Sequence, residues 1–91
     1  MTAKRRGKLE IVNDMLRSIQ NKGGKIKPTH LLYKSNLSHS KMKEYLKELM
    51  GKGMVSEIEE KGKKMFIITE KGVDFLLEFE RIKEFSDSFG I

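Results

Sequence analysis

The sequence predicts one small α+β domain that is mostly α-helical. With 91 residues, of which 37% are hydrophobic and 35% charged, the chain has the length and composition of a single, highly charged folded domain. Several segments repeat apolar residues at intervals of three and four positions, which is typical of helices that bury one face. Two shorter apolar segments flank a Gly-containing stretch, which is typical of a β-hairpin.

The first predicted helix runs from Lys8 to about Lys22. Gly23 and Gly24 end it, because glycine is favoured just past a helix C-terminus. The alternating segment 25–27 is compatible with a very short strand. The apolar residues of the helix follow the i, i+3, i+4, i+7 spacing of an amphipathic helix, and they are Leu9, Val12, Met15, Leu16 and Ile19.

Two further helices are predicted close together. Pro28 suits the first turn of a short helix over 28–34, where its missing N–H costs nothing. Residues 35–37 leave room only for a tight connection, and Ser38 is a good N-cap for a longer helix over 38–50. A short and a longer helix joined in this way predict a helix-turn-helix.

A β-hairpin is predicted directly after this helix pair. Its strands are expected over 54–58 and 64–68, with a turn over 59–63 in which Gly62 takes the permissive position. A hairpin in this place is the element called a wing, and we expect the wing to present residues 59–64.

The complete order predicts a winged helix-turn-helix of the form α-(β)-α-α-β-β-α with a C-terminal dimerisation helix. Thr69 is a suitable N-cap for this last helix, which we expect over 69–85. The basic residues 1–7 are predicted to form a flexible arm. The domain itself is expected over 8–85, followed by a frayed tail over 86–91.

Positive charge is concentrated in the first half of the chain. Residues 1–47 hold 12 Lys and Arg against 3 Asp and Glu, a balance of +9, whereas residues 48–91 hold 7 against 10, a balance of −3. A basic cluster with few acids indicates a surface that faces a polyanion such as nucleic acid. The alternative is that each lysine only solvates a helix face.

Three stretches resemble the small archaeal winged-helix DNA-binding proteins, a family of transcriptional regulators and 10-kDa chromatin-associated dimers. They are KLEIVNDMLRSI, GGKIKPTHLLYKSNLSHSKMKEYLKELMGKGMV and FIITEKGVDFL, which together extend from about Lys8 to Phe79. The resemblance implies binding to double-stranded DNA. It also implies dimerisation through the C-terminal helix, which forms an antiparallel coiled coil in the chromatin-type members. Here that helix has room for only about four turns.

Helical periodicity selects the predicted DNA contacts. On the helix over 38–50, a rotation of 100° per residue places Ser40, Glu44 and Lys47 opposite the apolar stripe, with Lys43 at the flank. A helix exposed in this way fits the major groove of B-DNA. Glu44 could accept a hydrogen bond from a cytosine amino group, or form an ion pair with Lys47. The full set of predicted DNA-binding residues is Arg5, Arg6, Thr29, Lys34, Ser38, His39, Ser40, Lys43, Glu44, Lys47, Lys61, Lys63 and Lys64.

The last predicted helix carries more apolar residues than one buried face needs. A monomer of this size can cover only one stripe, and an exposed apolar stripe usually marks an interface. We predict that the second of its two stripes is a homodimer contact; the alternative is that the first helix covers both. The stripes are Val73, Leu76 and Leu77 on one side, and Phe75, Phe79, Ile82 and Phe85 on the other.

The sequence argues against catalysis and cofactors. It has no Cys, and His30 and His39 lack the spacing of a metal pair, so we expect no metal site and no cofactor. Phosphate-binding glycine motifs and a nucleophile elbow are missing too, and we predict that the protein is not an enzyme. No apolar run approaches the ~20 residues of a membrane-spanning helix. We therefore expect a cytoplasmic, nucleoid-associated protein without a membrane partner.

The favoured function is a double-stranded DNA-binding transcriptional regulator that acts as a homodimer. The helix over 38–50 would lie in the major groove, and the wing over 59–64 on the backbone or in the minor groove. Three alternatives stay open: an architectural chromatin protein with little sequence specificity, a winged-helix protein-interaction module of a larger assembly, and an RNA-binding protein. RNA is least favoured because aromatic residues are not interleaved with the basic segments.

Overall fold

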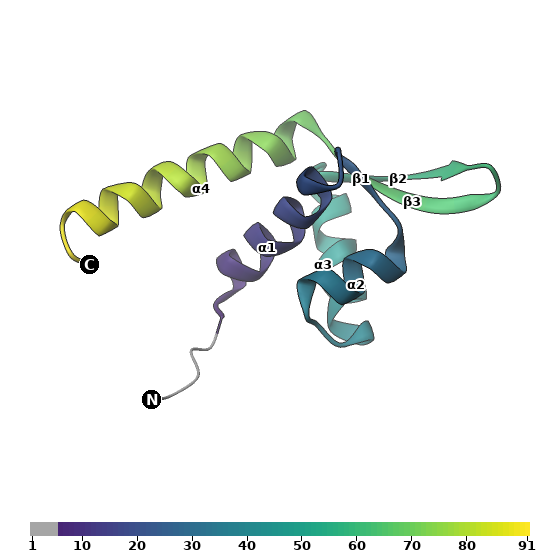
Figure 1. The fold of residues 1–91 in the computed structure, drawn as a ribbon, viewed down its shortest axis with the longest axis horizontal. Helices are drawn as coiled ribbons and strands as arrows, with labels where there is room; N and C mark the ends of the chain where they lie inside the picture. Colours follow the sequence, from purple (N-terminus) through teal and green to yellow (C-terminus); the bar gives the residue numbers. More distant parts are fainter. Residues whose placement is uncertain (1–5) are drawn as a thin grey trace.

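The computed structural model describes residues 6–91, and over that range it has four helices and one small antiparallel sheet (Figure 1). The elements in chain order are α1 (Lys8–Asn21), β1 (Lys25–Ile26), α2 (Pro28–Ser35), α3 (His39–Gly51), β2 (Val55–Glu60), β3 (Lys63–Ile68) and α4 (Glu70–Ser88). This is the predicted element order, and it confirms the winged helix-turn-helix fold. Within the described range, no helix is long and apolar enough to cross a membrane.

The sheet has the strand order β1-β3-β2, and both pairings are antiparallel. The two-residue strand β1 pairs only with the inner end of β3. β2 and β3 pair over their full length, from Val55 opposite Ile68 to Glu60 opposite Lys63. β1 covers only the base of the β2–β3 hairpin. The outer part of this hairpin projects beyond the helices, and α4 extends to the opposite side of the molecule (Figure 1).

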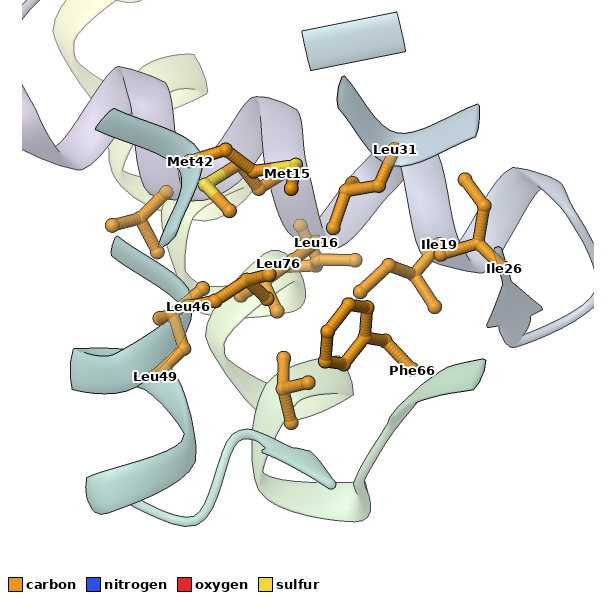
Figure 2. Close-up of a cluster of buried hydrophobic side chains, with 12 residues drawn as sticks. Met15, Leu16, Ile19, Ile26, Leu31, Met42, Leu46, Leu49, Phe66 and Leu76 are labelled. Atoms are coloured by element: carbon orange, nitrogen blue, oxygen red, sulfur yellow. The ribbon is translucent and has the colours of Figure 1, made fainter. Parts of the chain in front are cut away.

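One hydrophobic core joins the helices to the base of the sheet. The side chains of Met15, Leu16 and Ile19 from α1 are fully buried at its centre. In Figure 2 they face side chains from α2, α3 and α4, and the ring of Phe66 points into the same cluster. The predicted buried face of α1 is correct except at Leu9, which is 59% exposed. The core consists of Val12, Met15, Leu16, Ile19, Ile26, Leu31, Met42, Leu46, Leu49, Val55, Phe66 and Leu76.

Local polar contacts set the geometry of the helix-turn-helix. Asn36 has a φ of 56°, and this left-handed conformation ends α2. Ser38 is the N-cap of α3, as predicted, and its Oγ accepts a hydrogen bond from the Lys41 backbone N–H at 3.2 Å. The buried Ser35 hydroxyl donates to the Leu31 carbonyl oxygen at 2.7 Å, so it has a partner where α2 meets the core.

The hairpin turn is tighter than predicted. Only Lys61 and Gly62 lie between the strands, with φ values of 53° and 76°. Positive φ at both central residues is the type I′ pattern, which matches the twist of the flanking strands. Glu59 and Glu60, which were predicted to lie in the turn, belong to β2. Opposite charges across the strands, as in Glu60 opposite Lys63, favour this longer pairing.

The first turn of α4 packs closely on the loop after α3. Thr69 is the N-cap: its Oγ1 accepts a hydrogen bond from the Gly72 backbone N–H at 3.2 Å and donates to the Gly53 carbonyl oxygen at 2.6 Å. Gly72 is buried, and a Cβ there would lie 2.5 Å from the Met54 carbonyl oxygen and 2.7 Å from Ile68 Cγ1. Glycine is required here because no side chain fits.

α4 ends at Ser88, later than the predicted end at Phe85. The tail predicted to fray over 86–91 is therefore helical in its first half. Ser88 Oγ donates to the Phe85 carbonyl oxygen at 2.8 Å, and the ring centroids of Phe85 and Phe89 lie 4.9 Å apart. These contacts offset the low helix propensity of the Ser-Asp-Ser sequence.

The arm predicted ahead of the first helix is only partly within the described range. Residues 1–5, and with them the candidate Arg5, lie outside it. Arg6 Nη1 lies 2.8 Å from Asp14 Oδ2, and Arg6 Nη2 donates to the Asn36 carbonyl oxygen at 3.2 Å. Arg6 is therefore held between α1 and the end of α2 instead of extending from a flexible arm.

An ion pair joins the start of α1 to α3. Lys8 Nζ lies 2.6 Å from Glu48 Oε2. This hydrogen bond lowers the pKa of the Glu48 carboxyl and raises the pKa of the Lys8 ammonium. Both groups are therefore charged at neutral pH, and this exposed ion pair links α1 to the helix that carries the candidate site.

Candidate nucleic-acid interface

The outer face of α3 is open to solvent. Met42, Leu46 and Leu49 are buried on the inner side of the helix, as the periodicity predicts. The six candidate residues on α3 and at its N-cap are all exposed, and they are Ser38, His39, Ser40, Lys43, Glu44 and Lys47. The fold therefore leaves the predicted face of α3 accessible to a partner.

α3 and the hairpin form the two walls of one groove, which we call the α3–wing groove. Its α3 wall is one flank of the helix, where His39, Lys43 and Lys47 follow at four-residue intervals. Its hairpin wall carries Glu57 and Lys64. The structure thus brings predicted site residues from the helix and from the wing together. The floor of the groove is apolar and is formed by Met42, Leu46, Met50 and Phe66, with Pro28 at the edge.

Uncompensated positive charge in this groove comes from α3. The two hairpin residues form an ion pair of their own at 3.7 Å. Glu44 pairs with Lys41 at 3.7 Å, and not with Lys47, the partner that the sequence offered as an alternative. Among the described residues, no carboxylate lies within 4.0 Å of the ammonium group of Lys43 or Lys47. These two lysines therefore keep their charge available for an anion.

A second basic region, which sequence reasoning largely missed, lies on the other face of the hairpin base. Met65 and Lys64 are neighbours in β3, so their side chains point to opposite faces of the sheet. Lys25 Nζ in this region lies 2.7 Å from Glu60 Oε2. The signal that could have found it is the alternating Lys25-Ile26-Lys27 segment just before α2. The depression is lined by Lys22, Lys25, Ile26, Lys27, Thr29, His30 and Met65, of which only Thr29 was predicted as a contact.

The remaining candidates are dispersed. Lys61 and Lys63 are exposed at the tip of the hairpin, and Lys34 is exposed near the end of α2. Arg6 is paired with Asp14 and lines neither of the two basic regions. Arg6 therefore lies apart from the other candidates in the described range, which are exposed on α3, on the hairpin and on α2.

α4 divides its apolar residues differently from the prediction. Phe75 is half-buried against the core, and its ring stacks on that of Phe79 with centroids 6.0 Å apart. Leu77, which the periodicity grouped with Leu76, is 58% exposed. The reason is that the rest of the domain covers the part of the α4 surface that lies between the two predicted stripes. Each stripe therefore has one buried edge, next to this covered part, and one exposed edge.

Three large apolar side chains remain uncovered at the outer end of α4, two on the helix and one at its C-cap, Phe89. Ile82, Phe85 and Phe89 are 64%, 63% and 67% exposed, and their spacing places them on one side of the helix. We call these three residues the α4 stripe. Two of them, Ile82 and Phe85, belong to the predicted dimer contact; Phe89 was not predicted.

A helix-turn-helix with an exposed second helix, followed by a β-hairpin, defines the class of winged helix-turn-helix proteins. The sequence profile of this family, described as winged helix-turn-helix, matches residues 5–87, and the chain belongs to it. No curated protein sequence gives a significant match.

Solved structures with the same fold include DNA-binding proteins. The chain is similar to Sso10a-2, a DNA-binding protein from Sulfolobus solfataricus, with 26% identity and a TM-score of 0.79 over 92% of this chain and 85% of that one. F93 from STIV, a winged-helix DNA-binding protein, has 15% identity and a TM-score of 0.70 over 88% and 92%. A MarR family transcriptional regulator from Silicibacter pomeroyi DSS has 21% identity and a TM-score of 0.73 over 90% of this chain and only 57% of its own.

Proposed function

We propose that this protein binds double-stranded DNA as a homodimer and regulates transcription. The observation that carries the proposal is the pair Lys43 and Lys47, exposed on α3 without an acidic partner among the described residues and facing the wing across one groove. α3 would enter the major groove, and the wing would follow the backbone or the minor groove. The likeness to Sso10a-2 and F93, both described as DNA-binding proteins, supports this assignment.

Phosphate contacts are expected to dominate over base contacts. α3 contains no Arg, Gln or Asn, the side chains that most often make bidentate contacts with bases. Ser38 already uses its hydroxyl as the helix cap. Glu44 remains as the one acid on this helix face that could accept from a cytosine amino group. We therefore expect modest sequence specificity together with a strong dependence on salt.

The test is a titration of the protein with a duplex of random sequence and a duplex obtained by selection, at several salt concentrations. About six phosphate contacts per protomer give a slope of log K against log salt of about −5, and about twice that for a dimer. A response that does not change with salt would contradict DNA binding and favour the protein-interaction module. Equal affinity for both duplexes would favour the architectural alternative.

The dimer part of the proposal rests on the α4 stripe. Its three residues are each about two-thirds exposed, and an apolar cluster of this kind on a small domain commonly marks an interface. A symmetric contact would bring the stripe against its own copy. Two protomers joined in this way could present two copies of α3 to half-sites about one helical turn apart.

Sedimentation equilibrium at tens of micromolar tests the dimer. Wild type is expected to have the mass of a dimer, and Phe85→Glu is expected to be a monomer, because it would bury two carboxylates in the contact. Leu77→Glu is the matched control: Leu77 is equally exposed but lies on another side of α4, so this variant should stay dimeric. A monomeric wild type, or equal behaviour of the two variants, would rule out the α4 stripe as the contact.

A further inference from the structure

The floor of the α3–wing groove is apolar, although the groove lies on the face proposed to meet DNA. Met42, Leu46 and Phe66 line the floor and are at most 5% exposed, so the groove reaches down to the hydrophobic core. Its volume is about 550 Å³, within the range of about 300–1,000 Å³ that small-molecule sites occupy. A phosphate backbone contacts charged and polar groups and would leave this floor unused.

The charged residues around the opening of the groove determine which ligand charge the groove can bind. Glu57 and Lys64 neutralise each other on the hairpin wall. Glu44 also lines the α3 wall, but it pairs with Lys41, which lies outside the groove. The uncompensated charge is therefore positive and comes from Lys43 and Lys47 on the α3 wall. A lysine can lay its alkyl chain along an apolar surface while its ammonium group binds an anion. An apolar floor below two such lysines therefore matches a small molecule with an apolar body and one anionic group.

We propose that the α3–wing groove binds an aromatic or alkyl monocarboxylate. The apolar body lies on the floor formed by Met42, Met50 and Phe66, and the carboxylate lies between Lys43 and Lys47. The consequence for DNA rests on the proposed function: these lysines are the same ones that would contact phosphate, so the carboxylate and DNA bind in competition. The ligand is then an effector that releases the protein from DNA.

Methyl NMR of methionine-labelled protein with 2-naphthoate tests binding without any DNA. The methyl signals of Met42 and Met50, which line the groove, are expected to shift together and to saturate with a dissociation constant of about 1 mM. The signals of Met15, which is fully buried in the core, and of Met65, on the other face of β3, should not move. Absence of shifts at Met42 and Met50, or equal shifts at all four methionines, would overturn the proposal.

The charge requirement is tested separately. The double variant Lys43→Gln, Lys47→Gln should bind 2-naphthoate about tenfold more weakly. Lys52→Gln removes an exposed lysine outside the groove and should bind like wild type. The neutral analogue 2-naphthalenemethanol should bind wild type about tenfold more weakly than 2-naphthoate. Equal binding of the two compounds would overturn the role assigned to the lysines.

A duplex-displacement titration then separates this inference from the proposed function. If 2-naphthoate shifts the methyl signals of Met42 and Met50 and also releases bound duplex, the proposed DNA binding and the proposed carboxylate site are both supported. If it shifts these methyl groups while the duplex affinity stays the same, the competition is wrong. If the protein never binds duplex, the proposed function fails, whereas the groove remains a carboxylate site.

Discussion

Replacing Gly72 by alanine is expected to lower the free energy of unfolding by about 2 kcal/mol, with a fall in Tm of about 10 °C. The new Cβ would lie 2.5 Å from the Met54 carbonyl oxygen, a backbone atom that cannot move without displacing the loop between α3 and β2. Ile68 Cγ1, at 2.7 Å, closes the other side. Urea unfolding followed by circular dichroism measures the loss.

Gly51→Ala is the matched control for this substitution. Gly51 is the last residue of α3 and has no positive φ, and a Cβ added there would meet no atom of another segment within 4 Å. Alanine there should leave stability unchanged or raise it by up to about 0.5–1 kcal/mol, because alanine is the better helix former. If Gly72→Ala unfolded at the same urea concentration as Gly51→Ala, the close approach of α4 to Met54 would be wrong.

The double variant Lys43→Ala, Lys47→Ala is expected to weaken binding to duplex DNA at low salt by about 100-fold for each protomer that contacts the duplex. In the proposed complex, each lysine would contribute one charge-assisted contact with phosphate, worth about tenfold in affinity. The slope of log K against log salt should become shallower by about two for each protomer. Fluorescence anisotropy of a labelled duplex measures both quantities.

A charge-matched control separates local contacts from net charge. Lys52→Ala, Lys71→Ala also removes two positive charges, but both lysines lie outside the α3–wing groove. This control should change the affinity by less than about threefold, because distant surface charges are largely screened in salt. If the two double variants bound equally, DNA binding would depend on overall charge and not on the outer face of α3.

Periodicity was sufficient to predict the four helices and most of the buried faces of α1 and α3, because the residues of each of these faces lie within one segment of the sequence. The buried stripe of α3, with Met42, Leu46 and Leu49, follows directly from the helical repeat. Features that depend on distant segments were predicted less well. β2 extends through Glu59 and Glu60 because residues across the hairpin support it, and Gly72 is needed because the backbone near Met54 approaches it.

Candidate-site features that depend on contacts between distant segments were also predicted less well. The sequence selected Lys43 and Lys47 correctly as exposed residues, since exposure on a helix follows from its period. It could not show that Arg6 pairs with Asp14, because that contact depends on how the chain enters α1. It also could not show which arc of α4 the rest of the domain would cover, and so Phe75 was assigned to the partner.

The length of α4 separates the proposed dimer contact from the rest of the domain, which carries the proposed DNA-binding face. The α4 stripe begins at Ile82, 12 residues after α4 begins at Glu70, which is roughly 18 Å along the helix axis. In the proposed homodimer, the reach of each α3 from the symmetry axis is therefore set by the number of helical turns before Ile82. In that homodimer, inserting one turn would move the half-sites apart without altering a residue proposed to contact DNA, so the length of α4 would set the operator spacing.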